Sequence, residues 1–245
     1  MKNYDTADLR NVALIGHKGS GKTSFAEALL FAGKQTNRLG SIQEHNTVMD
    51  FEAEEQRREM SIQLGVGFIE HQKRKINFID SPGEPNFFFS VQQALAVCEG
   101  AVLVISGSDG VQAGAEKAFI HAREQGLACA VFVSKIEREQ VDFGKVVADL
   151  RENLSPQAVA VQVPIGAEGD FTGVVDLVTR KALTYKKDGS GGFSVGDVPA
   201  DLKDAVEEAR GKLVEEVASA DDALLEKFLE SGELPAAVNN EDLQE

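Results

Sequence analysis

Residues 16–24 read GHKGSGKTS. This stretch fits the pattern G-x-x-x-x-G-K-[ST], with Gly16, Gly21, Lys22 and Thr23 at the fixed positions. Glycines allow the close backbone approach that an anion needs, and loop N–H groups followed by a helix N-terminus favour phosphate. Lys22 supplies positive charge to the outer phosphates, and the Thr23 hydroxyl is a ligand for Mg²⁺. The stretch predicts a phosphate-binding loop but leaves open which nucleotide it binds.

The residues on either side separate this interpretation from a chance match in a glycine-rich turn. Residues 11–16, NVALIG, are apolar and rich in branched side chains, which predicts a buried strand. Residues 22–33, KTSFAEALLFAG, place Phe25, Leu29 and Leu30 on one side of a helix. A strand, a glycine loop and a helix in this order form the context in which the motif is a phosphate site.

Further along the chain, strand and helix patterns alternate. Two strand-like runs, at 61–70 and 75–80, flank the polar turn HQKR and predict a hairpin. The expected helices then cover 87–98, 113–126 and 142–153, and the expected strands cover 101–106 and 128–134. This alternation predicts an α/β fold with a mostly parallel, doubly wound sheet, as in P-loop NTPase (GTPase) domains, over residues 1–156.

The pattern changes after residue 156. Short strand-like runs at 158–166, 171–178 and 181–187 are followed by a flexible turn at 188–192 and by acidic helical patterning over 200–231. Residues 157–245 therefore predict a small α+β insert. Residues 34–60 are polar and without a clear period, which is typical of a functional or disordered connection.

The charge of the chain limits its partners. The net charge is −15; residues 161–245 hold 19 acids and 8 bases, and residues 1–160 hold the other 21 acids and 17 bases. Such a surface does not attract nucleic acid in bulk, so we expect no DNA partner and only local contact with RNA. The acidic end is either a solvated helix face or a surface for a basic protein.

Other features of the composition indicate the compartment. No apolar stretch approaches the roughly 18 residues that span a bilayer, and the first residues lack the apolar core of a signal peptide. Cys98 and Cys129 stand in apolar surroundings, typical of core thiols in a reducing cytoplasm. We therefore expect a cytoplasmic protein that does not contact membranes.

Two further segments follow predicted strands. DSPGE, residues 80–84, comes after the strand that ends at Asp80; Asp80 would hold magnesium through water, and the Gly83 N–H would meet a terminal phosphate. VSKIERE, residues 133–139, comes after the strand over 128–134. The pattern D-x-x-G is weak alone, because both residues are common in turns, but it is a strong signal at the end of a predicted strand of a phosphate-loop fold.

With these segments the chain resembles the GTP-binding domain of translation elongation factor G. The similarity covers almost the whole chain and includes residues 49–62, which resemble the first switch of that family, and residues 165–178, which resemble the start of its insert. It implies GTP hydrolysis on the ribosome, where the family drives movement of the tRNA–mRNA complex. It also implies that the insert contacts ribosomal stalk proteins and that ribosomal RNA lies near the nucleotide site.

The resemblance assigns roles by position, with GTP or GDP and Mg²⁺ as the bound groups. Lys22, Gly83 and Glu84 take the catalytic positions, and Thr23, Ser61 and Asp80 take the metal positions. The nucleotide contacts would come from Gly16, His17, Lys18, Gly19, Ser20, Gly21, Lys22, Thr23, Ser24, Asp80, Gly83, Ser134, Lys135 and Glu137. Lys135 would lie along the guanine ring, and the carboxylate of Glu137 would accept hydrogen bonds from the ring N–H and the amino group of guanine.

The chain departs from the family at five positions. Glu84 replaces a histidine that places the attacking water, Gly19 an aspartate, Glu59 a glycine and Glu137 an aspartate, while Ser134 replaces an asparagine that ties the base loop to the phosphate loop. A carboxylate near the γ-phosphate is repelled, which favours impaired or differently triggered hydrolysis.

Three functions remain open at this point. The first is a translational GTPase, the second is a GTP-gated binding module with little turnover, and the third is a phosphate-loop ATPase or kinase. The last base-contacting segment of the family, an S-A-F-like stretch after the insert, is not found before residue 245. We therefore expect the chain to be a fragment of the nucleotide fold.

Overall fold

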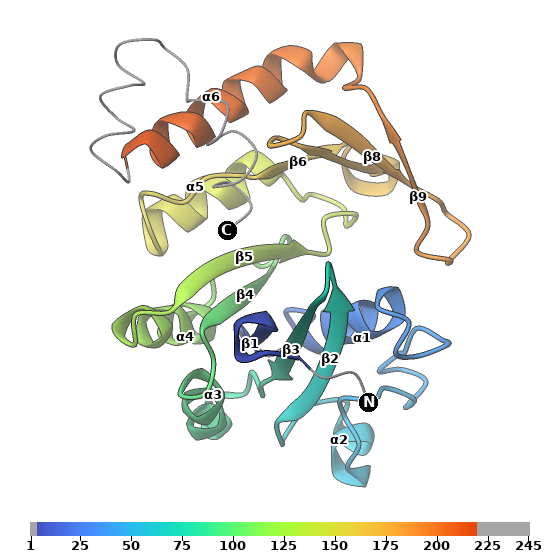
Figure 1. Cartoon of the computed structure of the whole chain (residues 1–245), viewed down its shortest axis with the longest axis vertical. Coiled ribbons are helices and arrows are strands. Elements are labelled where there is room, and N and C mark those ends of the chain that lie inside the picture. Colours follow the sequence, from blue (N-terminus) through green and yellow to red (C-terminus); the bar gives the residue numbers. More distant parts are fainter. Residues whose placement is uncertain (1–3, 220–245) are drawn as a thin grey trace. The chain divides into compact units, whose positions relative to one another are not determined.

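The computed structural model describes residues 4–219. The chain divides into two compact units between Lys135 and Ile136. Figure 1 shows the elements of both units, and each unit is described by itself below. The division into 1–156 and 157–245 stays a prediction about domain organisation.

The first unit is an α/β sandwich. Its sheet has the strand order β2-β3-β1-β4-β5, in which β1 pairs in parallel with β3 and β4, and β4 pairs in parallel with β5. The elements are η1 (Thr6–Asp8), β1 (Leu9–Ile15), α1 (Lys22–Ala32), α2 (Ala53–Arg58), β2 (Gly65–His71), β3 (Arg74–Asp80), η2 (Pro85–Phe87), α3 (Phe88–Leu95), β4 (Gly100–Ser106), α4 (Ala113–Glu124) and β5 (Ala128–Ser134). The predicted mostly parallel sheet is confirmed.

The core of this unit forms where helices cover the sheet. On one face, Leu14 of β1 and Phe78 of β3 pack with Ala26 and Leu30 of α1. Helices α3 and α4 lie on the other face, as Figure 1 shows. Because β1 and β4 are central and covered on both sides, they are apolar along most of their length.

The antiparallel part of the sheet is the predicted hairpin. Strands β2 and β3 pair from Gly65 opposite Asp80 to His71 opposite Arg74. The two turn residues, Gln72 and Lys73, have φ values of 45° and 68°, the positive values that a two-residue hairpin turn of the primed type requires. The hairpin fixes the end of β3, and so the position of Asp80.

The second unit holds an antiparallel sheet with one helix packed on it. Its strands have the order β6-β7-β8-β9, and α6 covers one face through Val206 and Leu213, which pack against Val175 and Ala182. The elements are α5 (Phe143–Asn153), β6 (Gln162–Ile165), η3 (Glu168–Asp170), β7 (Gly173–Asp176), β8 (Lys181–Tyr185), β9 (Phe193–Gly196), η4 (Ala200–Leu202) and α6 (Lys203–Ser219).

Most predicted elements are present within two to four residues of their expected bounds, and the small α+β insert is confirmed. Helix α2 inside the polar segment and strand β9 after the turn were not predicted. The helical pattern over 200–231 is confirmed as far as Ser219, and its remainder lies outside the described residues.

Candidate nucleotide-binding site

The loop over residues 16–21 joins β1 to α1 with the backbone of a phosphate-binding loop. Gly16, Gly19 and Gly21 have φ values of 142°, 77° and 96°, which residues with a side chain rarely adopt. A Cβ on Gly16 would also collide with the carbonyl oxygen of Val104. The three glycines therefore adopt the backbone conformations of the loop, as predicted for Gly16 and Gly21.

Lys22 begins α1 and folds back over the loop. Its ammonium donates to the carbonyl oxygens of Gly16 at 3.1 Å and His17 at 3.0 Å. Burial lowers the pKa of Lys22, while the charges of Asp80 and Asp50 oppose this shift. The ammonium is thus held at the loop by two backbone carbonyls and by the attraction of two carboxylates.

Three segments meet at the Thr23 hydroxyl. Thr23 donates to Asp80 Oδ2 at 2.8 Å, and its Oγ1 lies 3.1 Å from Ser61 Oγ. Burial raises the pKa of Asp80 to about 7, although Lys22 and Thr23 both oppose the rise. The structure thus brings together the three residues assigned to the metal, although Ser61 and Asp80 lie far from Thr23 in the sequence.

The donor set at this point fits Mg²⁺. It offers two hydroxyl oxygens and one carboxylate, the hard oxygen ligands that magnesium takes beside phosphates. Asp80 Oδ1 is buried and has no hydrogen-bond partner within residues 4–219. A buried carboxylate oxygen without a partner is costly unless a cation or water meets it.

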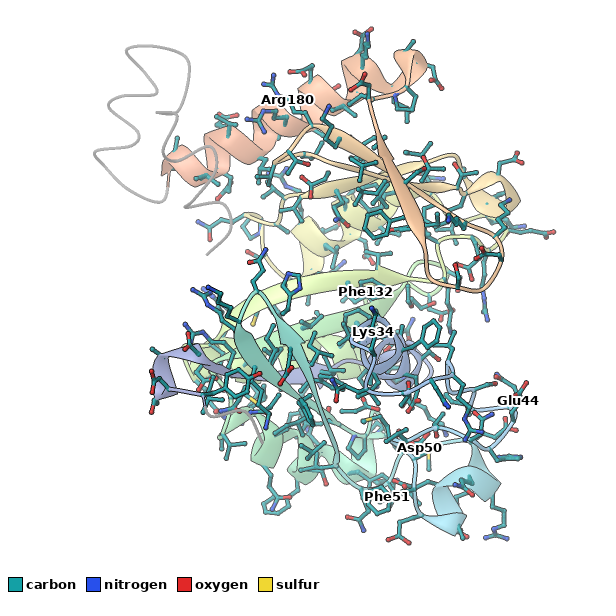
Figure 2. The ribbon with its side chains drawn as sticks, turned by 45° about the vertical axis from the view of Figure 1, so that its right-hand side comes forward. Lys34, Glu44, Asp50, Phe51, Phe132 and Arg180 are labelled. Atoms are coloured by element: carbon teal, nitrogen blue, oxygen red, sulfur yellow. The ribbon has the colours of Figure 1, made fainter. Side chains whose placement is uncertain are left out.

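Three further buried acids surround this cluster, and sequence reasoning missed them. Asp50 lies in the segment that leads into α2 (Figure 2), is 3% exposed, and has one unpartnered oxygen among the described residues. Burial raises its pKa, and a hydrogen bond from Ser61 opposes this. Glu27 and Glu55 are fully buried. Only the spacing of Glu52 and Glu55, a helix-capping pattern, signalled structure in this segment.

The segment after β3 is fixed against the phosphate loop. Ser81 Oγ donates to the carbonyl oxygen of Leu14 at 2.7 Å. A Cβ on Gly83 would lie 2.5 Å from both the Lys18 backbone nitrogen and Lys22 Nζ. Glycine is therefore required at position 83, and its backbone lies beside the Lys22 ammonium.

Glu84 does not project freely into solvent. Its carboxylate forms an ion pair with Lys18 of the phosphate loop, with Oε2 and Nζ 3.3 Å apart. The side chain of Lys18 is 51% exposed and that of Glu84 is 26% exposed. The residue assigned to water placement is thus paired with a cation of the loop.

The end of β5 is tied to the same loop. Ser134 Oγ donates to the Ser20 carbonyl at 2.6 Å and lies 3.2 Å from the Ile105 carbonyl oxygen. Lys135 Nζ donates to the Gly19 carbonyl. Glu137 follows in an exposed turn of the second unit. The assignment of Glu137 to recognition of the guanine base stays a prediction.

The other predicted loop residues differ in exposure. Ser20 is buried, whereas Gly19 and Ser24 are exposed. His17 Nδ1 is buried, has no hydrogen-bond partner in the described part of the chain, and lies close to where a Cβ on Gly114 would be. The ring of His17 therefore packs against α4.

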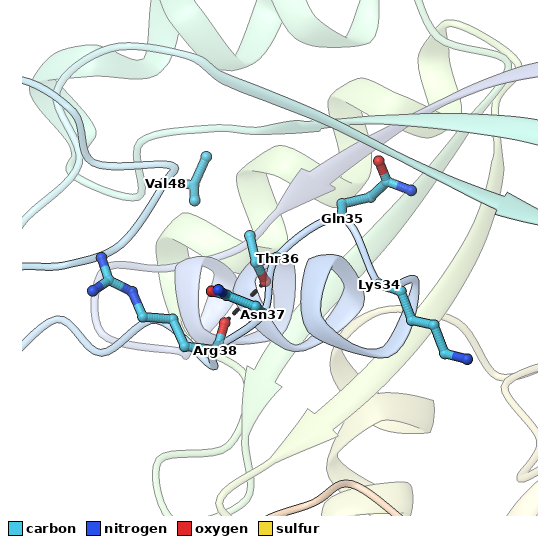
Figure 3. Close-up of a pocket in the computed structure, with 6 residues that line it drawn as sticks. All are labelled: Lys34, Gln35, Thr36, Asn37, Arg38 and Val48. Carbon is cyan, nitrogen blue, oxygen red and sulfur yellow. Dashed lines mark hydrogen bonds between the residues drawn. The ribbon is translucent and has the colours of Figure 1, made fainter.

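A surface hollow of roughly 760 Å³ lies apart from the phosphate loop (Figure 3). Lys34, Gln35, Thr36, Asn37, Arg38 and Val48 line it. Figure 3 shows the ends of Lys34 and Arg38 pointing in opposite directions, so the two cations do not converge on one ligand. Since none of these residues belongs to the cluster around Thr23, the hollow is separate from the candidate site.

Two negative findings concern the described residues alone. In residues 4–219 no helix combines the length and the apolar character that crossing a bilayer requires. The same residues contain no group of three or more histidine, cysteine and acidic side chains placed to hold a metal. The metal positions described above instead combine two hydroxyl groups with one carboxylate.

The parallel sheet, the glycine loop at the end of β1 and the Asp80 segment at the end of β3 define a P-loop nucleotide-binding domain. The chain belongs to the family described as the elongation factor Tu GTP-binding domain, whose sequence profile matches residues 7–238. This family places the chain among translational GTPases and implies that its nucleotide is a guanine nucleotide.

A solved structure supports the same placement. The crystal structure of ttk003000868 from Thermus thermophilus matches with a TM-score of 0.87 and 30% sequence identity. The match covers 95% of this chain and 34% of that protein. The chain thus spans about a third of the length of this relative.

Proposed function

We propose that the chain is the GTP-binding and GTP-hydrolysing domain of an elongation-factor-G-like protein that acts on the ribosome. The observation that carries this proposal is the cluster of Thr23, Ser61 and Asp80 beside Lys22. It joins the phosphate loop, the segment after α2 and the end of β3, the three segments that must respond to a terminal phosphate in a nucleotide switch.

In this mechanism the backbone N–H groups of residues 16–22 and the Lys22 ammonium bind the phosphates. Thr23, Ser61 and Asp80 would hold Mg²⁺, which neutralises charge on the phosphate oxygens when it is bound. The Gly83 N–H would donate to the γ-phosphate, because its backbone lies beside Lys22. Lys135 and Glu137 would contact the guanine base.

Glu84 is the residue that sets the hydrolysis rate in this proposal. An ionised carboxylate near the γ-phosphate adds negative charge where cations and N–H donors normally stabilise the transition state. Slow turnover, or turnover that a ribosomal contact triggers, follows from this arrangement. In the alternative, turnover is negligible and the same residues serve a GTP-gated binding module, because Glu84 replaces the family histidine.

The proposed partners follow from the family and from the resemblance. The insert, residues 157–245, would contact ribosomal stalk proteins, and ribosomal RNA would lie near the nucleotide site. A cytoplasmic location accompanies this role.

Nucleotide titration of the chain and of Lys22→Ala tests the proposal. Wild type should bind a fluorescent GTP analogue, and Lys22→Ala should lose this binding while its circular dichroism stays unchanged, because a charge-assisted contact to phosphate is removed. Lys34→Ala, which removes the same charge at the surface hollow, should bind like wild type. Competition by ATP as effective as that by GTP would favour the ATPase or kinase alternative.

A further inference from the structure

The ion pair between Lys18 and Glu84 links the phosphate loop to the segment after β3, with 3.3 Å between Nζ and Oε2. The backbones that carry the two side chains lie close to each other. A Cβ on Gly83, the residue before Glu84, would lie 2.5 Å from the backbone nitrogen of Lys18. The two backbones therefore lie close together where the pair forms, which keeps the side chains of Lys18 and Glu84 within reach of each other.

The second lysine of residues 16–24, Lys22, already interacts with other groups. Lys22 is 5% exposed, donates to two loop carbonyls, and its charge interacts with Asp80 and Asp50. Lys18 is therefore the cation of residues 16–24 that is available to Glu84. Without Lys18, the Glu84 carboxylate would stand uncompensated beside the place where the terminal phosphate binds.

We propose that Lys18 is a specificity-determining residue that lets the site accept a nucleoside triphosphate in spite of Glu84. The ammonium offsets part of the charge of the carboxylate, so that the γ-phosphate meets less negative charge than Glu84 alone would present. GDP lacks the γ-phosphate and should depend less on this compensation. This inference rests on the proposed function, since it assumes that the loop binds a guanine nucleotide.

The test is a double-mutant cycle on the affinity for GTPγS relative to the affinity for GDP. Wild type, Lys18→Met, Glu84→Gln and the double variant are titrated by calorimetry with Mg²⁺ and each nucleotide. Lys18→Met should reduce the GTPγS affinity relative to GDP by about threefold to tenfold, as expected for a partly exposed ion pair. Lys73→Met, the same charge change at the tip of the β2–β3 hairpin, should leave the ratio as in wild type.

The double variant identifies the mechanism. If Lys18 acts by compensating Glu84, removing the carboxylate in the double variant should restore the wild-type ratio. The loss in Lys18→Met should also shrink as salt is raised, because ions screen the uncompensated charge. A loss of packing would show neither behaviour.

The outcomes separate the two proposals. If wild type binds neither nucleotide, the proposed function fails and this inference fails with it. If wild type binds both and Lys18→Met leaves the ratio unchanged, only the inference is overturned. An altered ratio that persists in the double variant also overturns it, because Lys18 would then act on the phosphate independently of Glu84.

Discussion

The hydroxyl of Ser134 donates to the backbone carbonyl of Ser20 over 2.6 Å, and this bond ties the end of β5 to the phosphate loop. The resemblance assigned this tie to an asparagine that the chain lacks. In this chain the shorter serine side chain makes the contact.

Ser134→Ala should therefore destabilise the first unit by about 1 kcal/mol, the usual contribution of one hydrogen bond. It should also weaken nucleotide binding, because the loop loses one restraint. Urea unfolding and GDP titration measure the two effects. Ser194→Ala, at an exposed position of β9, is the matched control. Equal stability and equal GDP affinity of the two variants would show that the Ser134–Ser20 hydrogen bond contributes to neither.

Gly83→Ala should abolish tight nucleotide binding without unfolding the chain. The added methyl group would lie 2.5 Å from a backbone nitrogen of the phosphate loop, which cannot move aside as a side chain does. We expect at least a tenfold loss of affinity, about 1.4 kcal/mol. The control is Gly169→Ala, whose Cβ would meet nothing within 4 Å. Wild-type affinity in Gly83→Ala would show that the segment after β3 moves freely.

Glu84→His should raise the rate of GTP hydrolysis in the presence of ribosomes. The substitution removes a negative charge near the transferring phosphoryl group and supplies an imidazole that can orient water. A gain of about tenfold or more is expected, since about 1.4 kcal/mol of barrier suffices for it. Single-turnover rates of wild type, Glu84→His and Glu84→Ala provide the measurement. A fast wild type that both substitutions slow would mean that Glu84 itself positions the water.

The stability of the first unit should depend on pH through Glu27. Its carboxylate is fully buried and accepts from the N–H groups of Val48 at 2.7 Å and Met49 at 3.0 Å. Burial raises its pKa, and the two N–H donors oppose this rise without cancelling it. The folded chain thus holds the proton more tightly than the unfolded chain, so stability falls as pH rises from about 4.3, the ordinary glutamate value.

Glu27→Gln keeps an acceptor for both N–H groups and removes the buried charge. We expect the variant to gain stability relative to wild type near pH 7, and this advantage to diminish as pH falls toward 4. Urea unfolding of both proteins across this range measures it. A difference that stays constant with pH would mean that Glu27 titrates alike in the folded and unfolded chain.

Arg210 should stabilise the second unit more than an exposed arginine does. It is 8% exposed, and its guanidinium donates to the carbonyls of Leu177 and Val178. Arg210→Met leaves these acceptors without that donor, at an expected cost of about 1–3 kcal/mol. Arg180→Met, which loses an exposed ion pair to Glu207, should cost less than about 1 kcal/mol. Equal costs in thermal unfolding would contradict this account.

The sequence predicted those parts of the fold that follow from strong local patterns. Apolar periodicity located α1 and the central strands, and the glycine motif located the loop, because both depend on residues close together in the chain. Helix α2 and strand β9 are short and polar, and no periodicity distinguishes them from a loop. The contact of Ser61 with Thr23 was expected only through the resemblance, since it joins residues far apart in sequence.

Buried acids were the least predictable part of the candidate site. Glu27 belongs to the helical pattern of residues 22–33, and Asp50 precedes the acidic stretch 52–55. Both look like solvated side chains, because carboxylates are seldom fully buried unless paired. Their partners are backbone N–H groups and hydroxyls contributed by distant segments. Such pairings exist only once the chain has folded, so no local pattern indicates them.

The buried carboxylate of Glu55 restrains the segment that contains Ser61. One of its carboxylate oxygens accepts from the N–H groups of Ile62 and Gln63, and the other accepts from the N–H of Glu52. The Glu55 side chain thereby connects the two ends of the segment 52–63 through hydrogen bonds. If these bonds hold when Ser61 moves away from Thr23, α2 moves with it, and residues 52–63 should respond to the ligand as one unit and not by gradual fraying.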